Sequence, residues 1–69
     1  MTQTQMVFDY MMQNGSISPM EAITELGVMR LASRIHDLRI AGVTVNSQTE
    51  KGKNRFGEDV HFTRYSLGV

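Results

Sequence analysis

Two arginines spaced one helical turn apart stand out for the chemistry they offer. Arg30 and Arg34 flank Ser33 in a segment whose apolar spacing predicts a helix over residues 28–41. Side chains four residues apart share a helix face, and a guanidinium can bond a phosphate or a guanine edge with two parallel hydrogen bonds. These three residues are candidates for contacting DNA. Alternatively, the face is only solvated, and Arg34 pairs with Asp37.

A second group of polar, mostly basic residues lies in the C-terminal half. It consists of Lys51, Lys53, Asn54 and Arg55. Glycines flank this stretch, which is typical of the exposed tip of a β-hairpin. Such a tip can hold the phosphate backbone of DNA or enter its minor groove. The alternative is an ordinary polar tip whose basic residues keep the sheet edge soluble.

Other kinds of site have little support in the sequence. The only two histidines, His36 and His61, stand 25 residues apart, and there is no cysteine to complete a metal site. The serines lie in no strand-turn-helix nucleophile motif, and the glycines form no phosphate-binding loop. We therefore expect no enzymatic activity, no metal and no cofactor.

The charge is unevenly distributed along this neutral chain of 69 residues. Residues 1–29 contain three acidic and no basic side chains, whereas residues 30–69 carry a net charge of +3. A small protein can thereby present a basic face, although chance segregation is an alternative. Apolar runs fall far short of the roughly 20 residues that span a bilayer, and no secretion signal is visible. We expect a cytoplasmic protein with no membrane partner.

Three helices are predicted to position the candidate residues. Their ranges are about 4–13, 19–26 and 28–41. The start of the second is indicated by Ser18 as the N-cap, Pro19 at the first helical position and Glu21 as the partner in a capping box. In the third, the apolar spacing 3, 4, 3 predicts one buried stripe and a separate polar arc. The stripe is Val28, Leu31, Ile35 and Leu38, and the arc is Arg30, Ser33, Arg34 and Asp37.

The remaining chain is predicted to form a hairpin with strands at about 43–50 and 58–67. The second strand alternates imperfectly, which indicates either a bulge or packing on both faces. The expected fold is mainly α with a small β-hairpin. Three helices followed by a two-stranded antiparallel wing make residues 1–69 a single winged helix-turn-helix domain.

The sequence also resembles a known family. The segments that carry the resemblance are Gly15 to Ala22, Leu26-Gly27, Arg30 to Arg39, Gly42 and Val45. Over about residues 5 to 67 the chain is similar to the small winged helix-turn-helix domains encoded by phages and prophages. The resemblance implies binding of double-stranded DNA.

Two functional hypotheses follow. The first is a DNA-binding phage or prophage protein of a bacterial host cell, acting as a transcriptional regulator or recombination accessory factor. A homodimer or cooperative array is expected, because one domain offers few base contacts. The alternative is a protein-binding module on the same scaffold that binds or inhibits a host protein. The zero net charge, Asp37 on the polar arc, and Met20 and Met29 favour this alternative.

Overall fold

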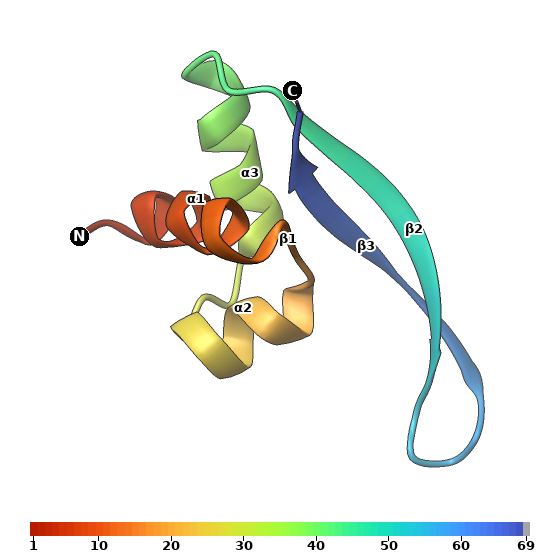
Figure 1. The fold of residues 1–69 in the computed structure, drawn as a ribbon. Helices are drawn as coiled ribbons and strands as arrows, with labels where there is room; N and C mark the ends of the chain where they lie inside the picture. Colours follow the sequence, from red (N-terminus) through yellow and green to blue (C-terminus); the bar gives the residue numbers. More distant parts are fainter. Residues whose placement is uncertain (69) are drawn as a thin grey trace.

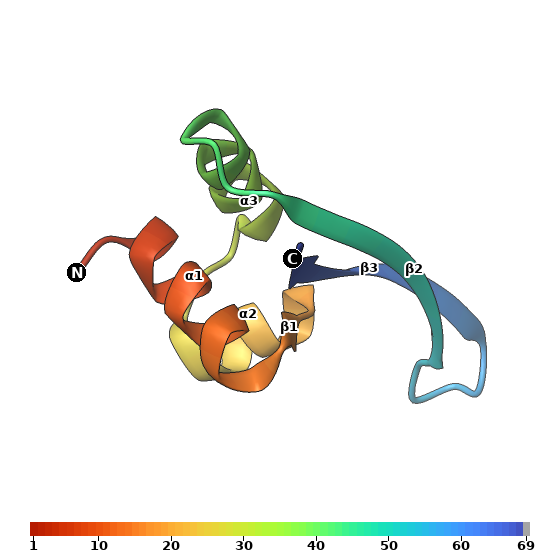
Figure 2. The same ribbon diagram turned by 45° about the horizontal axis from the view of Figure 1, so that its top comes forward.

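The computed structural model describes residues 1–68. Its elements are α1 (Gln3–Asn14), β1 (Ser16–Ile17), α2 (Pro19–Leu26), α3 (Leu31–Ile40), β2 (Val45–Lys53) and β3 (Asp59–Leu67). The three helices pack together, and the β2–β3 hairpin projects well beyond them (Figure 1). A view turned by 45° shows the same separation between the helices and the outer half of the hairpin (Figure 2).

The starts of the first two helices follow from side-chain caps. The Thr2 hydroxyl accepts a hydrogen bond from the Gln5 N–H, and Gly15 ends α1 with a φ of 88°. At α2, the Ser18 hydroxyl accepts from the Glu21 N–H, while the Glu21 carboxylate accepts from the Ser18 N–H. Each contact satisfies a backbone donor that has no partner within its helix. The predicted capping box of α2 is confirmed.

The predicted start of the third helix is wrong by three residues. Gly27 adopts a left-handed conformation with a φ of 68°, and the Val28 N–H donates to the Ala22 carbonyl at 2.8 Å. Val28 is 1% exposed, so it belongs to the core but closes α2 instead of opening α3. The Arg30 carbonyl accepts the first helical hydrogen bond, from the Arg34 N–H. The turn between α2 and α3 therefore places Arg30 just before the helix.

The sheet has three antiparallel strands in the order β1-β3-β2. The predicted two-stranded wing therefore lacked one strand, β1. In the added strand, Ser16 pairs with Ser66 and Ile17 pairs with Tyr65. Pro19 disfavours helical geometry at Ser18, which is extended and follows the strand directly. The Ile17 side chain is fully buried. The short link thus ties the base of the wing to the helices.

The hairpin is paired without interruption from Val45 opposite Leu67 to Lys53 opposite Asp59. There is consequently no bulge, and alternate residues point to opposite faces. We call one the odd-numbered face, because it carries the odd-numbered residues of both strands, including Val45, Lys51 and Leu67. The other is the even-numbered face. Because β2 extends to Lys53, the tip is residues 54–58, and both lysines lie in the strand, not in the tip as predicted.

The core draws on all three helices, β1 and β2, and the partly buried Tyr65 and Leu67 of β3 pack against it. Its buried side chains are Val7, Met11, Ile17, Ala22, Val28, Leu31, Ile35, Leu38 and Val45. The three from α3 lie on one side of that helix, as the apolar spacing predicts. Burial of this stripe leaves the opposite side of α3 turned toward solvent.

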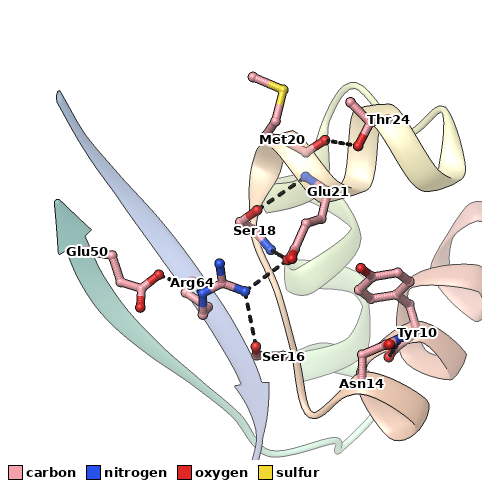
Figure 3. Close-up of polar contacts among 9 residues, drawn as sticks. All are labelled: Tyr10, Asn14, Ser16, Ser18, Met20, Glu21, Thr24, Glu50 and Arg64. Carbon is pink, nitrogen blue, oxygen red and sulfur yellow. Dashed lines mark hydrogen bonds and ion pairs between the residues drawn. The ribbon is translucent and has the colours of Figure 1, made fainter. Parts of the chain in front are cut away.

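Arg64 of β3 joins the hairpin to the helices (Figure 3). Its Nε donates to Glu50 on β2 at 2.6 Å, and its Nη1 donates to Glu21 at the start of α2 at 2.9 Å. The same Nη1 also reaches the Ser16 hydroxyl at 3.1 Å. One guanidinium therefore connects all three strands of the sheet with α2, and it restrains the wing relative to the helices.

These contacts change the acidity of the groups involved. Desolvation raises the pKa of Glu21, but hydrogen bonds from the Ser18 N–H and Arg64, with the charge of Arg64, outweigh it, so the pKa is lowered. The hydrogen bond to Glu50 is the largest cause of the raised pKa of Arg64. Both shifts favour the charged forms, and these hold the cluster together.

The lowered pKa of Glu21 makes stability depend on pH. The unfolded carboxyl titrates near 4.5, so its contribution is complete above that pH and is lost as the pH falls through the lower folded value. Glu21→Gln keeps a capping acceptor but lacks the charge. We expect the stability advantage of the wild type to shrink below about pH 4.5 in urea unfolding. A difference independent of pH would contradict this assignment.

Removal of the Ser18 cap tests how much the start of α2 contributes. Ser18 is 4% exposed, and Ser18→Ala leaves the Glu21 N–H without its acceptor. We expect a loss of about 1 kcal/mol in the free energy of unfolding, measured by urea denaturation. Ser47→Ala, at an exposed position of β2, is the control and should change stability by less than about 0.5 kcal/mol. Equal losses in the two variants would count against the cap.

Candidate nucleic-acid interface

The outward face of α3 is centred on different residues from those predicted. Each residue advances about 100° around a helix. Opposite the buried stripe of Leu31, Ile35 and Leu38 lie Ser33 and Ile40, with His36 and Asp37 on either side of them. His36, Asp37 and Ile40 are exposed. The predicted arc of Arg30, Ser33, Arg34 and Asp37 includes part of this face but leaves out His36 and Ile40. His36 was therefore missed, although a helical wheel that starts at Leu31 reveals it.

Arg34 lies at one edge of this face, beside α1. Its side chain is 31% exposed, and its Nη2 is 3.4 Å from the Asp37 carboxylate. Asp37 also accepts a hydrogen bond from the Thr4 hydroxyl of α1 at 3.3 Å. The Nε of Arg34 is buried and has no hydrogen-bond partner within residues 1–68. The arginine thus has spare donor capacity but is already engaged by a neighbouring acid, as the alternative interpretation expected.

Arg30 stands at the other end of the face, next to the wing. It occupies the N-cap position of α3, is exposed and makes no side-chain capping bond. A groove of about 400 Å³ separates Arg30 and Ser33 from Thr63 and Tyr65 of β3. Thr63 and Tyr65 belong to the odd-numbered face of the hairpin. The start of α3 and this face of the wing therefore flank one groove.

The two lysines extend that surface along the hairpin. Lys51 and Lys53 point to the odd-numbered face, opposite His61 and Asp59. The Nζ of Lys53 is 2.7 Å from the Asp59 carboxylate, and both side chains are about two-thirds exposed. Exposed ion pairs contribute little net free energy. Lys53 can therefore exchange its carboxylate for a phosphate at small cost.

The two predicted residues that lie in the tip, Asn54 and Arg55, have different roles. The Oδ1 of Asn54 accepts hydrogen bonds from the N–H groups of Phe56 and Glu58, at 2.9 and 3.1 Å. Its side chain therefore shapes the turn. The Arg55 guanidinium lies over the Phe56 ring, 5.1 Å from its centroid, and the ring is 73% exposed. No role for Phe56 was predicted from the sequence.

The structure brings only part of the predicted site together. Arg30 and Ser33 share a groove with the face that carries Lys51 and Lys53. Arg34 lies on the flank near α1, and Asn54 is used within its own turn. Arg64, which restrains the wing, was also missed. No short-range pattern identifies it, because 43 residues separate it from Glu21.

Residues 1–68 lack two other features. This part of the chain contains no group of three or more His, Cys, Asp or Glu residues arranged to hold a metal ion. None of its helices combines the length and apolar character needed to cross a membrane.

Comparison with known proteins agrees with this architecture. A family model described as a winged helix-turn-helix domain matches residues 2–69. No match is found among curated proteins or among solved structures. The model covers nearly the whole sequence, including the three helices and the hairpin. The chain therefore belongs to the winged helix-turn-helix domain family.

Proposed function

We propose that this protein binds double-stranded DNA, with the start of α3 in the major groove and the wing along the backbone. One observation carries the proposal: Arg30 and Ser33 flank the same groove as the hairpin face that bears Lys51 and Lys53. A major groove about 12 Å wide admits an α-helix. Family membership supports the same class of partner.

The residues differ in their proposed tasks. Arg30 and Ser33 contact base edges, because they lie at the exposed N-terminal end of α3. Arg34 contacts a phosphate at the α1 flank, where the nucleic acid replaces or shares its partner Asp37. Lys51, Lys53 and Arg55 neutralise backbone phosphates, and Asn54 maintains the turn that presents Arg55. The phosphate contacts position the protein, and the base contacts specify the sequence.

The biological setting is part of the proposal. The resemblance to phage and prophage domains supports a transcriptional regulator or recombination accessory factor that acts in the cytoplasm of a bacterial host. A single domain with two or three base contacts binds weakly. Binding as a homodimer, or as a cooperative array on repeated sites, would supply the missing affinity.

A second candidate function has its own supporting observation. An apolar groove of about 240 Å³ lies between the start of α2, at Pro19 and Met20, and Val60 and Phe62 of β3. Met20 is 67% exposed. Apolar exposed surface is typical of protein-binding sites, so a host protein is the alternative partner. Binding to such a groove would be nearly independent of salt, unlike binding to DNA.

Loss of one phosphate contact should be visible in the salt dependence of binding. Lys51→Ala should weaken binding to any duplex and reduce the slope of log K against log salt by about 0.9. Titrations at several salt concentrations measure this slope. Gln13→Glu changes the net charge equally, at an exposed position of α1, and should leave the slope unchanged. Equal effects of Lys51→Ala and Gln13→Glu on the slope would exclude a phosphate contact at Lys51. If the wild type bound no duplex at low salt, the proposed DNA binding would be refuted.

Loss of a base contact should instead affect discrimination. Arg30→Ala should reduce the preference for a duplex selected from a random pool, relative to a scrambled duplex, by about 1–3 kcal/mol. Lys53→Ala is the matched control and should weaken both duplexes by the same factor. Competition binding measures both ratios. An unchanged preference in Arg30→Ala would remove Arg30 from sequence recognition.

A further inference from the structure

An exposed aromatic ring stands at the end of the basic wing. Phe56 lies in the turn between β2 and β3 and is 73% exposed. Single exposed apolar residues are common and need no special explanation. Its position sets it apart, because the turn that contains it lies at the tip of the hairpin, far from the helices (Figure 1).

The turn holds Phe56 in a defined place. Its N–H donates to the Oδ1 of Asn54 at 2.9 Å. The turn is closed by the Asn54 N–H donating to the Glu58 carbonyl and by the Gly57 N–H donating to the Asn54 carbonyl, each at 3.0 Å. Gly57 has a φ of 78°, a region that glycine adopts without strain. The ring is therefore presented on an ordered loop, so little further ordering is needed on binding.

The charges around the ring favour a polyanion with flat apolar surfaces. Arg55 covers one side of the ring, and Lys51 and Lys53 lie along the adjoining strand. Of the two nearby acids, Asp59 pairs with Lys53, and the Glu58 carboxylate accepts a hydrogen bond from Asn54. With three cations and two acids, residues 51–59 carry a net charge of +1. Stacked base pairs between phosphate chains match this combination of cations and an aromatic ring.

We propose that Phe56 is a wedge that enters the minor groove and partly separates two stacked base pairs. The inference rests on the proposed DNA binding. Nine residues of β2 span about 26 Å, which exceeds the roughly 17 Å of half a helical turn, so the tip can reach the minor groove beside the site of α3. The ligand is duplex DNA with a flexible pyrimidine–purine step at that position, because such steps unstack most readily.

The test compares Phe56→Ala with Phe56→Leu, because leucine also serves as a wedge in minor-groove proteins. DNA bending is measured by energy transfer between the ends of a bound duplex, and unstacking by 2-aminopurine fluorescence at the step. The wild type should bend the duplex by about 20–90°. Phe56→Ala should abolish bending and weaken affinity about ten-fold, with an unchanged salt slope because no phosphate contact is lost. Phe56→Leu should retain most of both.

Each other outcome has a distinct meaning. If Phe56→Ala binds and bends DNA like the wild type, the wedge is excluded while DNA binding stands. If Phe56→Ala loses self-association in sedimentation but bends DNA normally, the ring contacts protein and the wedge is again excluded. If the wild type binds no duplex at low salt, the proposed function itself fails. Because the ring is mostly exposed, the melting temperature should be nearly unchanged in both variants.

Discussion

The burial of one stripe of α3 determines which surface the protein presents. Leu31, Ile35 and Leu38 pack in one cluster with Val7 and Met11 of α1. Because this stripe is fixed in the core, Ser33, His36, Asp37 and Ile40 point outward, and Arg34 lies on the flank. A domain this small has a marginal core, so its stability depends on the burial of this stripe. The proposed recognition surface is thus a consequence of core packing.

The electrostatic organisation is local. The chain is neutral, and the candidate cations Arg34 and Lys53 each already face a carboxylate. Neutralising phosphates therefore means exchanging weak surface pairs for stronger ones with a polyanion. By contrast, Arg64 joins three strands and α2 and serves the architecture. Basic residues in this protein therefore divide into those proposed to bind DNA and those, such as Arg64, that hold the fold together.

Local signals in the sequence predicted much of the fold. The start of α2 was predicted from Ser18, Pro19 and Glu21, because a helix cap involves residues only three apart. Val28 was misassigned because a buried residue just before a helix repeats the helical spacing. The strand at Ser16 and Ile17 was missed because it is two residues long and pairs across the chain.

The site was harder to predict than the fold. Arg30 and Lys51 were identified from residue type and spacing, but their common groove depends on how the hairpin lies against α3. Asn54 looks like a binding residue in the sequence, yet its side chain is used within the turn. His36 and Phe56 emerged only once burial was known. Contacts between distant residues, which no short-range pattern encodes, decide these roles.

The central claim is that DNA meets the outward face of α3 and the odd-numbered face of the wing together. Amide chemical-shift mapping by NMR during titration with a short duplex tests this most directly. We expect the largest shifts in residues 30–36 and 51–57, with small shifts along the outward faces of α1 and α2. Shifts concentrated around Met20, Val60 and Phe62, or confined to one of the two predicted segments, would contradict it.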